Sequence, residues 1–251
     1  MRISRVFVSA PLEASGLLEV HGETSHYLKT VLRLRKGWKL VVFDGQGTEC
    51  PATVESFGRD STYLRLETPS RVNRESPLKI HLALGISRGE RMDLAIQKAV
   101  ELGVDRITPL LTEFCVVRLD EEKKALRLAH WERVMRSALE QCGRNVLPII
   151  DAPLTYETWL ASHQGAGLIL DPEAKMGLMD PPRSGNTLTL LIGPEGGLSE
   201  QERCDAIASG LTGVRLGPRI LRTETAVIAA ISAVQTLWGD LGGRDTSSVS
   251  S

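Results

Sequence analysis

The chain has 251 residues, of which 42% are hydrophobic and 24% are charged, with a net charge of −1 at neutral pH. This length and apolar content are enough for one large domain or two smaller ones with real cores. A net charge near zero excludes a globally basic nucleic-acid binder, so such a partner would need a local basic surface. The longest apolar run, residues 226–234, is far shorter than the roughly 20 residues of a membrane span. The first residues also lack a signal-peptide pattern. We therefore expect a cytoplasmic protein with no membrane partner.

The cysteines and histidines show no pattern of a metal site or a disulfide framework. The four cysteines are Cys50, Cys115, Cys142 and Cys204. They are scattered and contain no C-x-x-C pair, so we expect reduced thiols. His21 and His26 are five residues apart, and no carboxylate cluster completes a metal site with them. We expect no metal.

Short apolar segments separated by glycine turns indicate a small β-rich domain in residues 1–70, of the barrel type. The predicted strands are residues 5–8, 17–20, 38–43, 50–57 and 62–67. Residues 25–33 are predicted as a helix. Its apolar face would carry Tyr27, Leu28, Val31 and Leu32.

A basic cluster lies within eleven residues of this domain. Its members are Lys29, Arg33, Arg35, Lys36 and Lys39. Such a cluster is either a solvated face around a helix end or a surface that contacts nucleic-acid phosphates. These residues alone favour neither.

Strands and helices alternate in residues 78–239, which predicts a parallel sheet covered by helices on both faces. The predicted strands are residues 78–86, 104–111, 146–150, 167–171, 187–192 and 214–216. The predicted helices are residues 87–102, 120–143 and 156–161, one beginning at 199, and 225–238. The polar stretch 68–77 is predicted as the linker, and its residues 71–77 separate the two predicted domains. Residues 240–251 are predicted as a disordered tail.

Capping signals give the expected helix ends. The predicted N-caps are Ser87 with Glu90, Asp120, Ser199 with Glu202, and Thr223 or Thr225; the predicted C-cap is Gly103. The last helix is apolar almost all round, so we expect it to be buried on several sides, in the core or against a second subunit.

Two glycine-bearing turns follow late strands of this domain. One is Gly193-Pro194-Glu195-Gly196-Gly197, and the other lies between Leu216 and Ala226. Glycines let backbone approach a ligand closely, and the helices that follow supply N–H donors. Neighbouring strands of an α/β sheet bind ligands at their carboxyl ends, so these turns predict the binding site. No G-x-G-x-x-G or P-loop pattern competes.

These two turns, in this order, resemble the SPOUT class of RNA methyltransferases. Within it they resemble the family that methylates N3 of a uridine in 16S ribosomal RNA. Further segments similar to this family are Arg5–Phe7, His26–Arg33, Arg91–Val104 and Trp131–Arg144, followed by Pro148. Two positions depart from its pattern. Ser87–Glu90 lacks a leading lysine, for which Arg88 could substitute as a cation, and Cys115 stands where a serine is usual.

The resemblance implies an N-terminal PUA-like RNA-binding β-barrel. It also implies a SPOUT domain, residues 78–239, with a deep C-terminal trefoil knot. It implies a homodimer, for which the last helix is the interface candidate. It makes the basic cluster an RNA surface, whose predicted contacts are Arg5, Lys29, Arg33, Arg35 and Lys36.

The resemblance further implies that S-adenosylmethionine (SAM) binds between three loops. The predicted cofactor residues are Leu170, Ile192, Gly193, Pro194, Glu195, Gly196, Gly197, Leu216, Gly217, Ile220 and Leu221. Adenine needs an apolar slot with backbone donors and acceptors at its edge, which such loops provide.

Methylation of uracil N3 releases a proton and leaves an anion spread over O2 and O4. A guanidinium facing these oxygens would stabilise that anion, and Arg222 is the candidate. The alternative for Arg222 is a clamp on a phosphate or carboxylate. Glu195 would orient a ligand group or pair with an arginine, unless it is a plain turn residue. Glu224 is a candidate base, although a carboxylate in the first turn of a helix is favourable through the dipole alone.

The resemblance therefore predicts a SAM-dependent enzyme that methylates 16S ribosomal RNA of the small subunit at the uridine conventionally numbered 1498. Two alternatives stay open. One is a SPOUT enzyme acting on another RNA or on a ribose 2′-hydroxyl. The other is a non-catalytic RNA-binding assembly factor.

Overall fold

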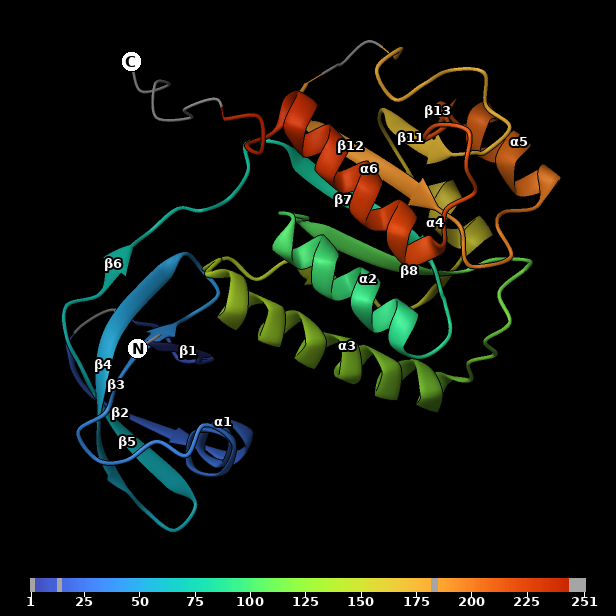
Figure 1. The fold of residues 1–251 in the computed structure, drawn as a ribbon. Coiled ribbons are helices and arrows are strands. Elements are labelled where there is room, and N and C mark those ends of the chain that lie inside the picture. Colours follow the sequence, from blue (N-terminus) through green and yellow to red (C-terminus); the bar gives the residue numbers. More distant parts are fainter. Residues whose placement is uncertain (1–2, 13–14, 182–184, 244–251) are drawn as a thin grey trace. The chain divides into compact units, whose positions relative to one another are not determined.

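The computed structural model describes residues 3–12, 15–181 and 185–243 (Figure 1). The chain divides into two compact units. The first contains residues 1–75 and 139–147, and the second contains residues 76–138 and 148–251. The structural boundary thus falls after residue 75. The sequence pattern gives no sign that residues 139–147 return to the first unit.

The first unit is built on a six-stranded sheet in the order β1-β3-β4-β5-β2, with β6 beside β4. The strands are β1 (Ser4–Phe7), β2 (Gly16–His21), β3 (Lys39–Phe43), β4 (Thr48–Phe57), β5 (Ser61–Leu66) and β6 (Ser70–Arg71). β1 pairs parallel with β3, and the other pairs are antiparallel. The five predicted strands are confirmed. No pairing in the described part of the chain joins β1 to β2, so barrel closure stays a prediction.

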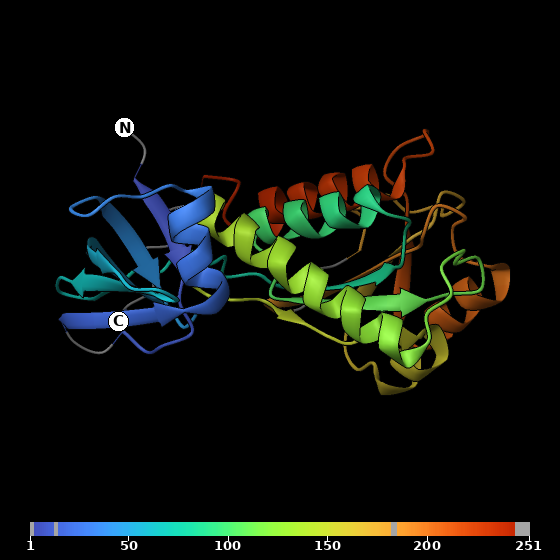
Figure 2. The ribbon, with the colours of Figure 1, turned by 90° about the horizontal axis from the view of Figure 1, so that it is seen from below.

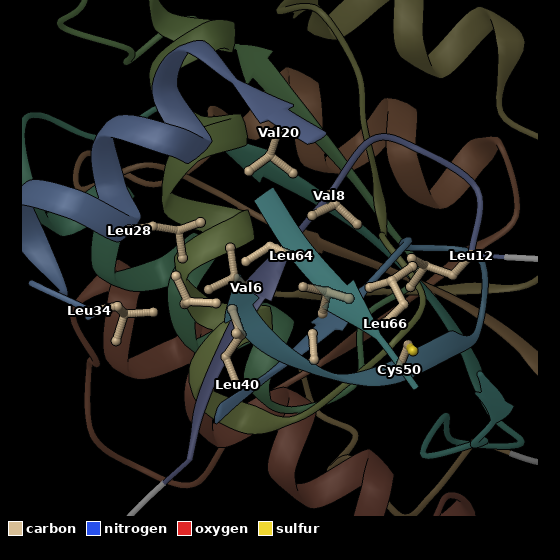
Figure 3. Packing of buried hydrophobic residues seen from close by; sticks show 13 residues of the cluster. Val6, Val8, Leu12, Val20, Leu28, Leu34, Leu40, Cys50, Leu64 and Leu66 are labelled. Atoms are coloured by element: carbon tan, nitrogen blue, oxygen red, sulfur yellow. The ribbon is translucent and has the colours of Figure 1, made fainter. Parts of the chain in front are cut away.

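Alternate strand residues fill one apolar core in this unit, where Figure 3 shows Val6, Leu40 and Leu64 in one cluster with Leu28. Each of these four side chains is at most 1% exposed. Period-two alternation places strand residues on one face, which is why the strands could be predicted from the sequence.

The predicted helix of this unit is present but changes its winding. α1 (Gly22–His26) continues as a π-helix, η1 (Tyr27–Val31). The Leu32 N–H donates to the Tyr27 carbonyl at 2.9 Å, which is the i to i+5 bond of that winding. The wider turn rotates Val31 off the apolar face, and its side chain is 60% exposed. The prediction that Val31 lies on this face is wrong.

A charged network holds the first unit together at Glu49. Its carboxylate accepts hydrogen bonds from Arg5 and Arg74, both at 2.8 Å, and from the Asn145 side-chain amide at 3.0 Å. Asn145 lies in the returning segment, so this network ties residues 139–147 to the sheet. The hydrogen bond from the Arg74 guanidinium lowers the pKa of Glu49 most, and Arg5 and Asn145 lower it further. Partial burial acts in the opposite direction, and the resulting pKa is about 2.

Part of the predicted linker is structured. Residues 70–71 form β6, and Arg74 reaches the network at Glu49. Glu75 pairs with the buried guanidinium of Arg144, also from the returning segment. A polar, proline-containing stretch can therefore be fixed by ion pairs that its composition does not show.

The second unit contains a seven-stranded parallel sheet in the order β10-β8-β7-β12-β11-β13, with β9 beside β8. The strands are β7 (Lys79–Gly85), β8 (Arg106–Leu111), β9 (Ile149–Ile150), β10 (Leu154–Thr155), β11 (Gly167–Leu170), β12 (Thr187–Ile192) and β13 (Leu211–Val214). The predicted parallel α/β architecture is confirmed.

Helices cover both faces of this sheet (Figure 1). They are α2 (Glu90–Glu101), α3 (Glu121–Cys142), α4 (Tyr156–Ser162), α5 (Glu200–Ala208) and α6 (Thr223–Trp238). α2 and α6 lie side by side on one face, as Figure 2 also shows. On the other face Trp159 of α4 and Ala206 of α5 pack with Ala83, Ile169 and Leu191 of the strands.

Three of the predicted helix-end signals are confirmed. Ser199 and Glu202 form a capping box at the start of α5. The Asp120 carboxylate accepts the Lys123 N–H at 2.9 Å ahead of α3. Gly103, just after α2, has a φ of 85°, which glycine adopts without strain.

Other predicted boundaries are wrong. α2 begins after Gly89, and no side chain caps it, because Ser87 lies two residues before the N-cap position. α6 begins after Arg222, also without a side-chain cap, so neither candidate threonine has that role. Gly210 ends α5, and β13 starts at once at residues 211–214. The predicted strand at 214–216 is therefore displaced, and residues 215–222 form a loop.

The burial of α6 follows one stripe. Val227, Ala230, Ile231 and Val234 are fully buried, whereas the intervening apolar residues of the helix are half-buried. The predicted tail lies mostly outside the described residues, at 244–251.

No disulfide joins any of the four cysteines. No group of three or more potential metal ligands occurs within residues 3–12, 15–181 and 185–243. None of the described helices is long and apolar enough to cross a membrane.

The Glu49 network predicts a pH-dependent stability. A lowered carboxyl pKa contributes stability at neutral pH that is lost as the pH falls from about 4.5 towards 2. Glu49→Gln should lower the free energy of unfolding at pH 7 by about 1–3 kcal/mol. Urea unfolding at pH 7 and pH 3 measures this, and the difference between variant and wild type should shrink at pH 3. Glu55→Gln, which removes an exposed pair with Arg65, is the matched control and should change nothing measurable. Equal effects of the two substitutions would contradict this role of Glu49.

Candidate functional site

A cavity of about 600 Å³ lies at the carboxyl ends of β11, β12 and β13 in the second unit. Three loops line it: residues 170–172, 192–198 and 214–223. Every residue predicted to bind the cofactor belongs to this lining. These residues are Leu170, Ile192, Gly193, Pro194, Glu195, Gly196, Gly197, Leu216, Gly217, Ile220 and Leu221. The order of strands brings together loops that are separated in sequence.

The backbone of the 193–197 loop can only follow its path because Gly85 lacks a side chain. A Cβ at Gly85 would lie 2.3 Å from Pro194 Cδ, so the end of β7 directly contacts the loop. Gly197 has a φ of 75°, in the left-handed region that favours glycine. The close approach explains the glycine at position 85, and the left-handed φ explains the glycine at position 197.

Glu195 joins this loop to the beginning of α2. Its Oε1 accepts the Arg88 N–H at 3.1 Å and an Arg91 guanidinium N–H at 3.3 Å. Burial raises the pKa of Glu195, but backbone N–H groups, including that of Arg88, together with Arg91 lower it below its ordinary value. An ionised carboxylate that already holds two donors is a positioning group. This agrees with the predicted alternative in which Glu195 pairs with an arginine.

Arg222 and Glu224 occupy different places. Arg222 lines the cavity and is exposed, and no hydrogen bond or ion pair within the described chain engages its guanidinium. Glu224 does not line the cavity. The residues of α6 that do, Thr223 and Ala226, share one side of the helix, and Glu224 lies about 100° round from Thr223. The role of Glu224 as a base therefore stays a prediction.

Several lining residues were missed as site residues. They are Arg91, Phe114, Arg203, Arg215 and Arg219. Arg203 pairs with Glu173 at 3.2 Å and with Asp171 at 3.8 Å, so it bridges α5 and the loop after β11. No motif marks an arginine of this kind, because the partners become neighbours only in the folded sheet.

Glu202 joins two segments next to the site. Its carboxylate accepts the Ser199 N–H at 2.8 Å and the Glu113 N–H at 2.9 Å. It is 6% exposed. One buried carboxylate thus caps α5 and fixes the loop that follows β8.

In the first unit, most side chains of the basic cluster are exposed to solvent. Arg33, Arg35 and Lys36 are exposed. Lys29 donates to the backbone carbonyls of Gly58 and Arg59 at 2.9 and 3.2 Å.

Arg5 differs from that cluster. Its guanidinium is bound by Glu49 and Asn145 and lies 5.0 Å from the centre of the Phe43 ring. The ion pair and the ring contact already occupy this side chain. We therefore leave Arg5 out of the candidate RNA surface.

Known proteins match both units. A family model described as an RNA methyltransferase domain matches residues 74–235, and one described as an RNA methyltransferase PUA domain matches residues 20–67. A relative from Buchnera aphidicola subsp. Schizaphis graminum, named ribosomal RNA small subunit methyltransferase E, is 37% identical over 242 residues. The match covers 96% of this chain and 98% of the relative.

Two similar solved structures contain a cofactor. A methyltransferase from Legionella pneumophila, in complex with bound SAM, is 40% identical with a TM-score of 0.93. That match covers 96% of this chain and 100% of the other. A ribosomal RNA small subunit methyltransferase E from Neisseria gonorrhoeae, bound to SAM, is 36% identical with a TM-score of 0.88, covering 95% and 99%.

The double role of Glu202 predicts a cost in stability. Glu202→Ala removes the capping box and the bond to Glu113, and should lower the free energy of unfolding by about 1–2 kcal/mol. Thermal or urea unfolding measures it. Glu200→Gln, an exposed change in the same helical turn, is the control. If both variants unfold like the wild type, the anchoring role is wrong.

Proposed function

Because the chain belongs to the ribosomal RNA small subunit methyltransferase E family, we propose that it methylates 16S ribosomal RNA of the small subunit. The proposed acceptor is N3 of the uridine conventionally numbered 1498, and the methyl donor is SAM. The cavity at the carboxyl ends of β11, β12 and β13 is the observation that carries the proposal, because its size lies within the range of cofactor sites.

The residues of this cavity fit SAM chemically. Backbone of the 192–198 and 214–223 loops lines it, and glycines allow that backbone to come close to an adenine edge. Leu170, Ile192 and Leu221 supply apolar surface. When bound, SAM supplies an electrophilic methyl group attached to a sulfonium.

The chain's own residues contribute positioning and electrostatics. Glu195 and Arg91 hold the 193–197 loop against the start of α2. Arg222, exposed in the cavity lining and without a partner in the described chain, stabilises the negative charge on O2 and O4 when N3 loses its proton. Enclosure by the three loops aligns the acceptor and excludes water.

In the first unit, the exposed basic residues of the cluster bind RNA phosphates. The match of residues 20–67 to an RNA methyltransferase PUA domain supports this assignment. Phosphate contacts fix register and orientation without reading sequence. The near-zero net charge of the chain is no obstacle, since the positive charge is local.

We also propose the finer architecture that the family resemblance implies. The first unit closes into a barrel, and the C-terminal part of the second is threaded into a deep knot. The Arg215 N–H donates to the Met176 carbonyl at 3.0 Å, so the loop after β11 lies against the segment after β13. The half-buried apolar residues of α6 support a homodimer through that helix. The cytoplasm, where ribosomal RNA is assembled, is the proposed location.

A methylation assay tests the proposed function. Labelled SAM is given with the protein to small ribosomal subunits, and separately to free RNA, from cells that lack the modification. Digestion and mass spectrometry then identify the nucleoside. The proposal expects 3-methyluridine at a single site. A 2′-O-methylated nucleoside, or transfer only to another RNA, would show that the proposed acceptor is wrong. SAM binding without any transfer would favour a non-catalytic assembly factor.

Arg222→Ala should reduce turnover about 10²- to 10³-fold while SAM affinity stays near wild type, since the lost interaction acts on the developing anion. Single-turnover kinetics and calorimetric titration of SAM separate the two. Arg118→Ala, an exposed arginine outside the cavity, is the control. Parallel losses of SAM binding and turnover would make Arg222 a part of the cofactor pocket instead.

Removing the charges of Arg33, Arg35 and Lys36 together should weaken RNA binding and reduce the slope of log affinity against log salt by about 2–3. Binding titrations at several salt concentrations measure both quantities. Arg65→Gln, which removes an exposed charge already paired with Glu55, is the matched control. An unchanged slope in the triple variant would remove this surface from the proposal.

A further inference from the structure

Phe114 is the single aromatic residue among the described residues that line the cavity. It lies in the loop between β8 and α3, and its side chain is 46% exposed. Neither the predicted cofactor residues nor the proposed anion stabilisation gives it a role.

The backbone on both sides of Phe114 is fixed. The preceding Glu113 N–H is bound by the buried carboxylate of Glu202 at 2.9 Å. The Sγ of the following Cys115 donates to the Ile86 carbonyl at 3.4 Å. The half-exposed ring is thus presented by an anchored turn.

The same residue packs on the loop of the cofactor cavity. A Cβ placed on Gly196 would lie 2.9 Å from Phe114 Cβ and 3.3 Å from its carbonyl oxygen. Gly196 therefore lets the 193–197 loop lie directly on Phe114. This contact sets the position of the ring relative to the loop.

The proposed reaction needs a flat apolar surface at this place. Uracil N3 lies on the base-pairing edge, so the base must leave its stack before the methyl group can reach it. An extruded base gains stability by stacking on an aromatic side chain. The other described lining residues are aliphatic, charged or small, so an arginine guanidinium could stack on a base but none of them offers an aromatic face.

We propose that Phe114 is the residue on which the target uracil stacks during methylation. This inference rests on the proposed function and deepens it. Stacking holds the plane of the base, while Arg222 acts on its oxygens. The two contributions are separate, because one is apolar and the other is electrostatic.

Kinetics of two substitutions test the proposal. Phe114→Ala should lower kcat/KM for RNA about tenfold or more, with SAM affinity unchanged, and Phe114→Tyr should restore most of it. Val116→Ala, an exposed apolar residue of the same loop outside the cavity, is the matched control. Weaker SAM binding by Phe114→Ala would overturn the proposal, because the ring would then cover the cofactor.

A second measurement isolates the stacked base. An RNA with an abasic nucleotide at the target position is bound in the presence of S-adenosylhomocysteine. Removing the base should weaken binding to the wild type about tenfold, and should change binding to Phe114→Ala much less. An equal loss in both proteins would refute stacking on Phe114. If the wild type methylates no ribosomal RNA, the proposed function itself fails; an active enzyme indifferent to Phe114→Ala contradicts this inference alone.

Discussion

Parallel pairing of β7 with β12 brings residues 79–85 beside residues 187–192, which are far apart in the chain. Because both strands run in the same direction, their carboxyl ends meet at one edge of the sheet. Gly85 then contacts Pro194, and the start of α2 comes within reach of Glu195. The cavity loops are built on this edge. If the pairing slipped by one residue, every side chain of the strand would change face and these contacts would be lost.

Local signals in the sequence predicted most helices and strands. They could not predict which residues, far apart in the chain, contact each other in the folded protein. The Ser199 capping box and the glycine turn after β12 depend on neighbouring residues, and both are present in the structure. The positions of β13 and of the start of α2 depend on long-range contacts instead. β13 pairs with β11, and residues at the start of α2 bind Glu195. Phe114 carries no local signal, since its role arises only where its loop meets Gly196.

Arginines of the first unit show why residue type alone is a poor guide to a nucleic-acid surface. Arg5 and Arg33 carry the same charge and both belong to segments typical of the family. The Arg5 guanidinium donates hydrogen bonds to Glu49 and Asn145, whereas Arg33 is exposed. The partners decide the difference, and one of them, Asn145, comes from residues 139–147. Burial and pairing therefore have to be known before a basic residue is assigned to RNA.

The discontinuous first unit constrains how the protein can be made. Asn145 holds Arg5, Glu49 and the Val72 carbonyl, and it is synthesised after β7, α2 and β8. The N-terminal sheet therefore cannot acquire its complete set of bonds until residue 147 has left the ribosome. In the second unit, β7 can pair with β12 only after residues 187–192 have also been synthesised. A fragment cut after residue 75 would lack this closing segment, so RNA-binding measurements on it would describe an incomplete unit.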